Sequence, residues 1–481
     1  DVDSQNFARG GTVITIPSVP GVGTYSAGIP VPNLSTIDVQ STLALNTNLG
    51  SITVPSNMLT GVVGADGNKA QITIGQGDKS TLPGDVKTAI GDRPLLRLTM
   101  SIDGKQTDWS NPKAPVTVAI PYTPTPEELA RPEHITVWYI DGSGRANSMN
   151  GQYDPLSGTV IFTTTHFSYY AVVYDPVARL AGTDRVETGF RIARAAYPDK
   201  VSHAVLATAN SYPDALAGSV LASYLNAPIL LVGSSEGDQG KVISYLSANL
   251  KPEGKVYILG GTGVISQSFA DKLSTAAIMN SRIAGKDRYD TSGNISEQLN
   301  VKTGTPVVLV SGENYPDALA VSSAAAQNQF PIFLVQKDSI SKAVSQELAD
   351  IKPSKIYLVG LEGAISPAVA SQAAKNAGLA AEDIVRIGGF DRYATSLAVA
   401  EYFNLGSQTL CIATGKNYPD ALAGSVYAAK YKAPIILIDS TLPTQTADYV
   451  KSGKPNETVI FGGEAVVGRT IEQQIRQLLN R

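Results

Sequence analysis

The stretch Asn210-Ser211-Tyr212-Pro213-Asp214-Ala215-Leu216-Ala217 is written three times in this chain. Its Tyr-Pro-Asp-Ala-Leu-Ala core returns within residues 313–320 and again within 416–423. The tyrosines of successive copies are 103 residues apart. A period of about a hundred residues is too long for a solenoid repeat, and it suits small domains in tandem.

Each copy carries the same companion motifs in the same order, so a whole fold unit is repeated. An Asp-Arg pair stands upstream, at Asp184-Arg185, Asp287-Arg288 and Asp391-Arg392. An apolar triplet follows downstream, at Ile229-Leu230-Leu231, Ile332-Phe333-Leu334 and Ile435-Ile436-Leu437. A glycine turn closes each copy, at Gly260-Gly261, Gly360-Leu361 and Gly462-Gly463, and the second copy has lost one glycine there.

From Pro176 onward, short apolar runs alternate with helical segments. Strands written as unbroken Val/Ile/Leu runs between helices predict a parallel sheet that is covered on both faces. In the first copy the strand ending at Ala181 comes first, and strands ending near Ile283 and Ile387 open the later copies. We therefore expect three tandem α/β modules of flavodoxin-like or Rossmann-like type, packed with approximate threefold symmetry. Their expected ranges are 177–281, 282–384 and 385–481.

Residues 1–175 show a different pattern. Short alternating or β-branched runs, such as 12–16, 71–74 and 116–120, are separated by Gly, Pro, Asn and Asp. This pattern is typical of a β-sandwich, in which one face of each strand is buried. The closing part, residues 151–170, resembles the last strands of β-sandwich modules in surface proteins of Gram-positive bacteria. We expect an N-terminal all-β domain that serves as a spacer, assembly or adhesion module.

The bulk composition limits the possible partners. The 481 residues are 43% hydrophobic and 17% charged, with a net charge of −4. Without a broad basic field, binding to nucleic acid is not expected, and no apolar run approaches the roughly 18 residues that cross a bilayer. The single cysteine, Cys411, lies in an apolar run and suits a buried core position. A start at Asp1 without methionine suits a secreted protein and equally a trimmed chain.

The repeated motifs should meet at one edge of each sheet. The Asp-Arg pair, the Tyr-Pro-Asp segment and the glycine turn each follow a strand and precede a helix. The carboxyl ends of parallel strands are where open α/β sheets place ligands, and helix amino termini with arginines favour an anion there. The predicted polymer-binding residues are Arg185, Arg288, Arg392, Asp184, Asp287, Asp391, Tyr212, Tyr315, Tyr418, Asp214, Asp317 and Asp420.

Each of these residue types also has a structural explanation. The aspartates can cap helices, and the arginines can pair with those aspartates. The tyrosines can stack on a sugar or pack between modules. The apolar triplets fit a core strand.

No catalytic site, metal site or cofactor is expected. The chain has no phosphate-binding loop of the Gly-x-x-x-x-Gly-Lys-Ser/Thr type and no Cys/His cluster for zinc. Its histidines, His134, His166 and His203, have no ligand spacing to one another, and a structural role near a strand end is expected for His166. Triplication argues against an enzyme and favours avidity, since several weak sites on one polymer bind better than one.

These segments resemble the type 2 cell-wall-binding modules of clostridia and related Gram-positive bacteria. The resemblance is carried by 179–185 with Thr188, by 212–217, by 228–231 and by the glycine turn, and it covers roughly residues 177–481. It implies a triangular unit of three modules outside the membrane. It also implies non-covalent anchoring to an anionic secondary wall polysaccharide or a teichoic-acid-like polymer. In that family the triplet is implicated in anchoring, which points here to Ile229-Leu230-Leu231 and its two counterparts.

The leading hypothesis is therefore a non-catalytic, secreted surface protein that is anchored to the cell wall. One alternative is a peptidoglycan-remodelling amidase or an amidase modifier. A second alternative is a self-assembling surface-layer component, with other surface-layer proteins as partners.

Overall fold

The computed structural model describes residues 11–36, 41–406 and 408–479. The predicted ranges 1–175 and 385–481 also contain residues outside this description. The chain divides into two compact units, residues 1–175 (unit 1) and 176–481 (unit 2).

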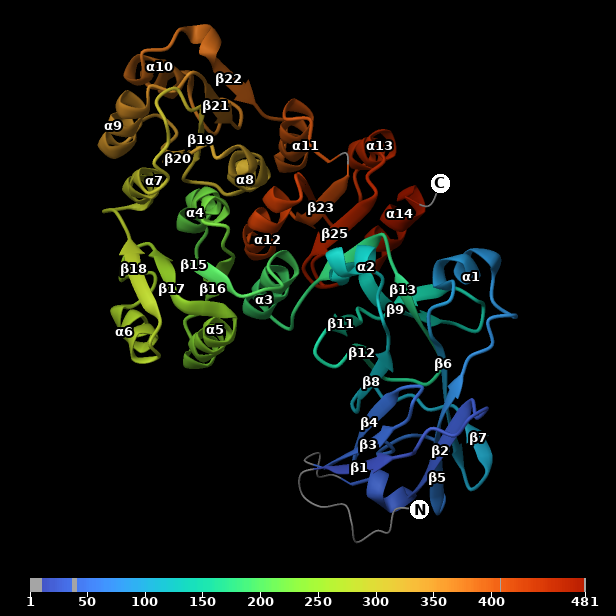
Figure 1. Ribbon diagram of the computed structural model, residues 1–481. Helices are drawn as coiled ribbons and strands as arrows, with labels where there is room; N and C mark the ends of the chain where they lie inside the picture. Colours follow the sequence, from blue (N-terminus) through green and yellow to red (C-terminus); the bar gives the residue numbers. More distant parts are fainter. Residues whose placement is uncertain (1–10, 37–40, 407, 480–481) are drawn as a thin grey trace. The chain divides into compact units, whose positions relative to one another are not determined.

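Unit 1 contains two β-sheets (Figure 1). The first has the order β1 (Thr12–Thr15), β3 (Thr42–Asn46), β4 (Ser51–Pro55), β8 (Val116–Pro121), β12 (Thr159–Thr164) and β11 (Gln152–Asp154). The second has the order β10 (Ala146–Ser148), β9 (Ile135–Ile140), β13 (Tyr169–Tyr174), β6 (Leu95–Ile102), β5 (Lys69–Gln76) and β2 (Thr24–Pro30), with β7 (Lys105–Thr107) paired to β6. Short helical segments connect them: η1 (Val31–Leu34), α1 (Gly84–Ile90), α2 (Pro126–Ala130) and η2 (Pro132–His134).

One apolar core joins the two sheets of unit 1. In β4 the side chains of Ile52 and Val54 are buried and alternate with less buried neighbours, and in β5 the same holds for Ile72 and Ile74. Residues of both sheets belong to this one core. The predicted β-sandwich is therefore confirmed.

Unit 2 contains three parallel sheets of four strands with the same strand order. They are β16 (Ile229–Val232), β15 (Val201–Thr208), β17 (Leu250–Leu259), β18 (Met279–Ile283); then β20 (Ile332–Val335), β19 (Val307–Ser311), β21 (Ile356–Val359), β22 (Ile384–Ile387); and β24 (Ile435–Ile438), β23 (Thr409–Thr414), β25 (Glu457–Phe461), β14 (Val177–Leu180). The helices are α3 (Arg185–Ala196), α4 (Pro213–Tyr224), α5 (Glu236–Asn249), α6 (Gln267–Thr275), α7 (Arg288–Glu297), α8 (Pro316–Asn328), α9 (Lys342–Ile351), α10 (Pro367–Ala377), η3 (Ala381–Asp383), α11 (Arg392–Tyr402), α12 (Pro419–Lys430), α13 (Thr444–Gly453) and α14 (Arg469–Leu479).

The strand before each Asp-Arg pair belongs to the sheet of the neighbouring module. β18 pairs with β17, and β22 pairs with β21. β14, which precedes α3, pairs with β25 near the end of the chain, with Leu180 opposite Phe461. The expectation that these strands open their own copies is therefore wrong. We define module 1 as α3 to β18, module 2 as α7 to β22, and module 3 as α11 to α14 with β14 as its fourth strand.

The short connection between β14 and α3 explains this exchange. Only residues 181–184 separate the two elements, and α3 packs against β16, at the edge of the module 1 sheet opposite to β18. Four residues span at most about 14 Å, so β14 cannot reach the β18 edge and completes a different sheet. With β14 as its fourth strand, module 3 joins the beginning of unit 2 to its end and closes the three modules into a cycle.

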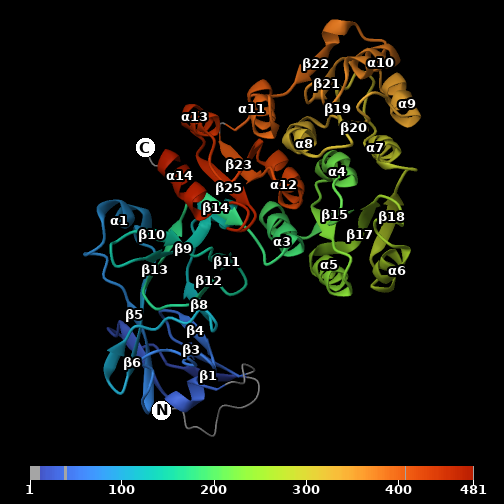
Figure 2. The same cartoon turned by 180° about the vertical axis from the view of Figure 1, so that it is seen from behind.

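The three modules share one core at their centre. Helices α4, α8 and α12 contact one another, and both views show them together where the modules meet (Figures 1 and 2). Leu216, Leu319 and Leu422, one from each of these helices, lie in the same buried apolar cluster. The predicted pseudo-threefold arrangement is confirmed.

Candidate functional site

The aspartates of the Asp-Arg pairs begin helices. Asp184 Oδ1 accepts hydrogen bonds from the backbone N–H groups of Val186 and Glu187 at 2.8 and 2.9 Å. Asp287 and Asp391 cap α7 and α11 in the same way. Helix capping therefore accounts for the aspartate in each copy.

Each paired arginine is held by a backbone carbonyl at the tip of the central strand of its own sheet. Arg185 Nη1 donates to the Ala209 carbonyl at 2.9 Å. In the same way Arg288 Nη1 donates to the Gly312 carbonyl and Arg392 Nη1 to the Gly415 carbonyl, both at 2.6 Å. The predicted pairing of these arginines with the adjacent aspartates is not what holds them. Arg185 and Arg288 are exposed and Arg392 is half-buried. Within the described residues, Nε and Nη2 of Arg185 take part in no hydrogen bond, which leaves one side of that guanidinium open to a ligand.

The same carbonyls accept a second hydrogen bond from a tyrosine of another module. Tyr212 Oη donates to Gly312 at 3.3 Å, and Tyr315 Oη donates to Gly415 at 3.3 Å. Tyr418 Oη completes the cycle on Ala209 at 3.5 Å. Each carbonyl at a strand tip therefore joins the tyrosine of one module to the arginine of the next.

The three tyrosine rings form a triangle at the pseudo-threefold axis. Their centroids are 5.5, 5.7 and 5.6 Å apart, with rings inclined by 59 to 64°. The Arg288 guanidinium lies over the ring of Tyr212 at 5.9 Å, and that of Arg392 lies over the ring of Tyr315 at 5.6 Å. Of the two explanations for the tyrosines, packing between modules is the one that the structure displays. Direct contact of these tyrosines with a polymer stays a prediction.

The aspartates of the Tyr-Pro-Asp segments lie deeper in the interfaces. Burial raises the pKa of Asp214 and of Asp420 to about 6, and burial also raises the pKa of Asp317. An arginine of the next module opposes each rise in pKa: Arg288 for Asp214, Arg392 for Asp317 and Arg185 for Asp420. For Asp317 a side-chain hydrogen bond with Thr395 opposes the rise more strongly than Arg392 does. A buried carboxyl and an arginine from two modules thus face each other at every interface.

The glycine turn makes room for these carboxyls. Gly260 has a φ of 88°, a left-handed conformation that L side chains rarely adopt, and a Cβ there would collide with Asp214. Gly360 and Gly462 share both properties, with φ values of 112° and 103°. A Cβ added at Gly261, the second glycine of the pair, would have no heavy atom within 4 Å. The leucine at the corresponding position 361 is therefore tolerated.

A second set of arginines was missed by the sequence analysis. Arg179, Arg282 and Arg386 lie in β14, β18 and β22, and each donates through Nη1 to the carbonyl of the glycine turn in the sheet that its strand completes, at 2.8, 2.8 and 2.9 Å. The signal was available, because an arginine stands five residues before the Asp of every Asp-Arg pair.

The apolar triplets are core strands. Ile229, Leu230 and Leu231 are at most 1% exposed, and the triplets of β20 and β24 are equally buried. In modules 2 and 3 the backbone N–H of the third triplet residue donates to a helix serine, from Leu334 to Ser292 at 3.1 Å and from Leu437 to Ser396 at 3.0 Å. Any contribution of the triplet to anchoring therefore acts through the fold of the module.

Other kinds of site find little support among the residues that the structure describes. No group of three or more His, Cys, Asp or Glu side chains is arranged to hold a metal ion there. Cys411 is buried in the core of module 3. No helix in the same part of the chain has the length and apolar character of a membrane span.

Comparison with known proteins points to the cell wall. The family model described as "Cell wall binding domain 2 (CWB2)" matches three times, at residues 179–270, 282–370 and 386–472. A solved structure of Cwp8 from Clostridium difficile is similar with a TM-score of 0.57 and 25% identity, over 63% of this chain and 52% of Cwp8.

Two curated proteins of Bacillus subtilis (strain 168) are also similar. N-acetylmuramoyl-L-alanine amidase LytC is 30% identical over 222 residues, which cover 46% of this chain and 43% of the amidase. An amidase enhancer is 26% identical over 229 residues, or 47% of this chain and 30% of the enhancer. The aligned part thus spans less than half the length of either relative.

Proposed function

Because this chain belongs to the cell wall binding domain 2 (CWB2) family, we propose that unit 2 anchors a non-catalytic surface protein to an anionic polymer of the cell wall. The anion-binding groups are the guanidinium groups of Arg185, Arg288 and Arg392, one in each module. A phosphate- or carboxylate-bearing polysaccharide, such as a teichoic-acid-like polymer, supplies the matching charge.

The observation that carries this proposal is the placement of the arginines. Each is the first residue of a helix and each is fixed by a carbonyl at a strand tip. A helix amino terminus carries partial positive charge, so the guanidinium and the helix attract an anion together. The carbonyl takes up one nitrogen and orients the rest of the planar fork, which lowers the entropy lost on binding.

We assign a supporting role to the other repeated residues at the strand tips. The capping aspartates start the helices, and the tyrosines and buried aspartates join the modules behind the arginines. Their removal would therefore weaken binding by loosening the unit.

The three arginine sites differ in the charge of a neighbouring residue. The residue two positions before the tyrosine is Asn210, then Glu313, then Lys416. Glu313 adds negative charge near Arg288 in module 2, whereas Lys416 adds positive charge in module 3, although it pairs with Asp439. We expect module 2 to bind an anionic polymer least strongly. Three weak and unequal binding sites for one polymer still give strong attachment by avidity.

Sedimentation with purified walls tests the proposal. The protein is expected to sediment with intact walls and to stay in solution after the anionic polymer has been stripped from them. The triple variant Arg185→Gln, Arg288→Gln, Arg392→Gln should bind less, and its binding should depend less on salt, because screened ionic contacts have been removed.

A matched variant separates charge at the tips from overall charge. Lys251→Gln, Lys375→Gln and Lys451→Gln remove three exposed positive charges away from the tips, one from each module. This variant should bind walls like the unaltered protein. Undiminished binding to stripped walls, or equal loss in both triple variants, would refute the proposal.

For unit 1 we propose display for adhesion or assembly. A second candidate function follows from the amidase and amidase-enhancer relatives: the anchored protein acts on peptidoglycan or activates an enzyme that does. Release of peptide or glycan fragments from purified peptidoglycan, by the chain alone or with an added amidase, would favour that candidate.

A further inference from the structure

Helix α1 covers part of the outer face of the second sheet of unit 1. Along β6, alternate side chains from Leu96 to Met100 belong to the core that joins the two sheets. Leu95, Arg97 and Thr99 therefore lie on the outer face. Leu95 is buried in a cluster with residues of α1, whereas Arg97 is exposed. The cover that α1 provides thus ends before Arg97.

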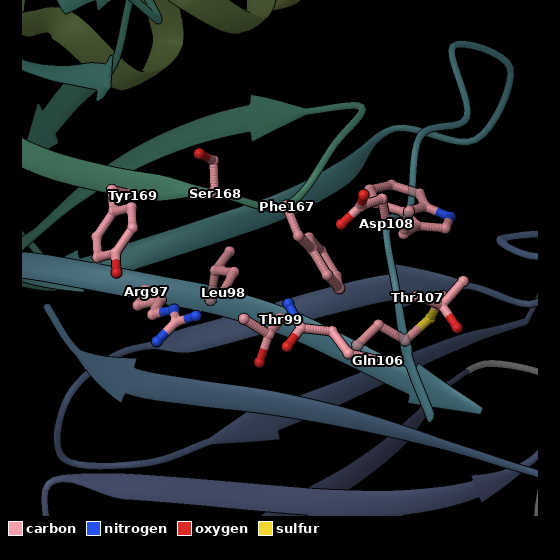
Figure 3. A pocket seen from close by; sticks show the side chains of 11 residues that line it. Arg97, Leu98, Thr99, Gln106, Thr107, Asp108, Phe167, Ser168 and Tyr169 are labelled. Atoms are coloured by element: carbon pink, nitrogen blue, oxygen red, sulfur yellow. The ribbon is translucent and has the colours of Figure 1, made fainter. Parts of the chain in front are cut away.

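A cavity of about 160 Å³ lies where β6, β7 and the beginning of β13 meet. Along β6, residues 95–97 pair with β13 and residues 100–102 pair with β7. Figure 3 shows side chains from all three segments around the cavity, among them Arg97, Thr99, Gln106, Asp108, Phe167 and Tyr169. Pockets for drug-sized ligands begin at roughly 300 Å³, so this cavity can enclose about one ring of a ligand.

Two aromatic rings at the cavity are held in place by their neighbours. The Phe167 ring points into the cavity and packs on Trp109, with centroids 4.7 Å apart (Figure 3). Trp109 is buried, and its Nε1 donates to the Met58 carbonyl at 2.9 Å. The Arg97 guanidinium lies over the Tyr169 ring, 5.5 Å from its centroid. These rings therefore lose little freedom when a ligand binds.

Four polar side chains at the cavity keep their hydrogen-bonding groups available. Thr99 and Gln106 carry a hydroxyl and an amide, and Arg97 and Asp108 carry a guanidinium and a carboxylate. Within the described residues, none of these four side chains takes part in a hydrogen bond or an ion pair. The cavity thus offers both donors and acceptors, and its positive and negative charges balance. Such a lining suits an uncharged ligand with many hydroxyl groups and gives no net attraction for an anion.

We propose that this cavity binds one uncharged pyranose residue of a glycan. One face of such a sugar ring carries C–H groups with small positive charges, and this face stacks on the negative face of the Phe167 ring. The hydroxyl groups of the sugar exchange hydrogen bonds with Thr99, Gln106 and Asp108. Because the cavity encloses about one ring, it recognises the end or a branch of the glycan.

This site gives the adhesion role proposed for unit 1 a class of ligand, and it rests on that role. It is independent of the anchoring proposed for unit 2, whose arginines take an anion. Hexoses and N-acetylhexosamines share the required ring. Hexoses occur in many surface polysaccharides, and N-acetylhexosamines occur in the glycan strands of peptidoglycan, so the experiment includes both.

Titration of the purified full chain with defined oligosaccharides tests the proposal. The probes are a trimer of N-acetylglucosamine and trimers of glucose, mannose and galactose. Trp109 is one of two tryptophans in the chain, so a sugar bound beside it should change the intrinsic fluorescence. Calorimetry gives the Kd. We expect saturable binding of at least one probe, and the probe that binds identifies which of the two sources supplies the glycan.

Variants connect the binding to the cavity. Phe167→Ala should weaken it by about 10-fold, the contribution of one aromatic contact. Gln106→Ala and Asp108→Asn change exposed residues, which leaves the fold intact, and each should weaken binding by roughly 2- to 10-fold. Tyr224→Ala and Asp66→Asn, an aromatic and an acidic residue exposed elsewhere, should bind like the unaltered protein. Circular dichroism verifies the folding of every variant.

Two results would overturn the sugar site. One is the absence of saturable binding to all four probes, and the other is equal affinity in the cavity variants and the control variants. Attachment of the full chain to surfaces coated with protein or with glycan separates this site from adhesion in general. Attachment to the protein-coated surface alone would sustain the adhesion role and refute the sugar site. Attachment to neither surface would refute both.

Discussion

Arg179 in β14 and Glu472 in α14 form an ion pair of 2.7 Å although 293 positions separate them in the sequence. Their side chains are only 2% and 6% exposed. The positions that correspond to Glu472, ten residues after the first glycine of the turn, are Ala270 in module 1 and Ala370 in module 2. The pair is therefore particular to the strand that closes the cycle.

Removing the acid of this pair should destabilise unit 2. Glu472→Gln leaves the Arg179 guanidinium buried without a countercharge, which costs about 3–5 kcal/mol of unfolding free energy. Glu236→Gln is a suitable control, because the 3.3 Å pair of Glu236 with Lys272 is exposed and should contribute less than about 1 kcal/mol. Urea unfolding of both variants measures the difference, and similar losses would show that the closing pair is not important.

Substitution of the two glycines of one turn should affect stability to different extents. Gly260→Ala introduces a Cβ at a positive φ and against Asp214, so we expect a loss of roughly 1–3 kcal/mol of unfolding free energy. Gly261→Ala meets nothing within 4 Å and should change stability little. Thermal unfolding of the two variants compares them directly. Equal effects would contradict the role assigned to the first glycine.

The tyrosine triangle should stabilise the interfaces between modules. Tyr315→Phe removes the hydrogen bonds of Oη with Gly415 and Arg392, a loss of about 0.5–1.5 kcal/mol. Tyr315→Ala also removes two ring contacts and should cost roughly 1–3 kcal/mol more. Tyr224, whose side chain is 42% exposed, provides the control through Tyr224→Ala. The expected order in urea unfolding is Tyr315→Ala least stable, then Tyr315→Phe, then the control.

The buried aspartates should make unit 2 more stable in weak acid. The pKa of Asp214 is about 6 in the folded protein against 3.8 for a free carboxyl, so the folded state binds more protons between these values. The carboxyl therefore destabilises the fold fully above about pH 6, and this cost disappears below about pH 4.

Asp214→Asn tests this dependence. The variant should be more stable than the unaltered protein at pH 7 by roughly 2–3 kcal/mol, and the advantage should vanish near pH 4. Asp448→Asn, at an exposed position of α13, should show no such difference between the two pH values. A constant advantage of Asp214→Asn at both pH values would contradict the raised pKa.

Much of unit 2 could be predicted from the sequence, because repeats show which features occur together. Unbroken apolar strands between helices indicated parallel sheets, and strand-to-helix positions indicated a common edge for Asp184, Tyr212 and Gly260. The sheet to which β14 belongs could not be predicted. In a tandem repeat, the strand before an Asp-Arg pair is equally well the first of one copy or the last of the copy before it. Only the geometry of the connection decides between these two assignments.

The roles of individual tip residues were less predictable for a different reason. Tyr212 has an apolar ring and a polar hydroxyl, so its type suits a sugar and a protein interface alike. What decides is the carbonyl of Gly312, which lies 100 residues away in the sequence and reaches Tyr212 only through the packing of two modules. The partners of Arg179, which are Gly462 and Glu472, could not be predicted for the same reason, because they also lie far from it in the sequence.

The strand that closes the cycle also fixes the copy number. Modules 1 and 2 end in their own fourth strands, β18 and β22, whereas the fourth strand of module 3 is β14, which lies before module 1 in the sequence. A gene that gained a fourth copy by duplication would encode one module more than the closed cycle of three can accommodate. Growth of such proteins is therefore expected by addition of whole triplets or of unrelated domains at the ends, and not one repeat at a time.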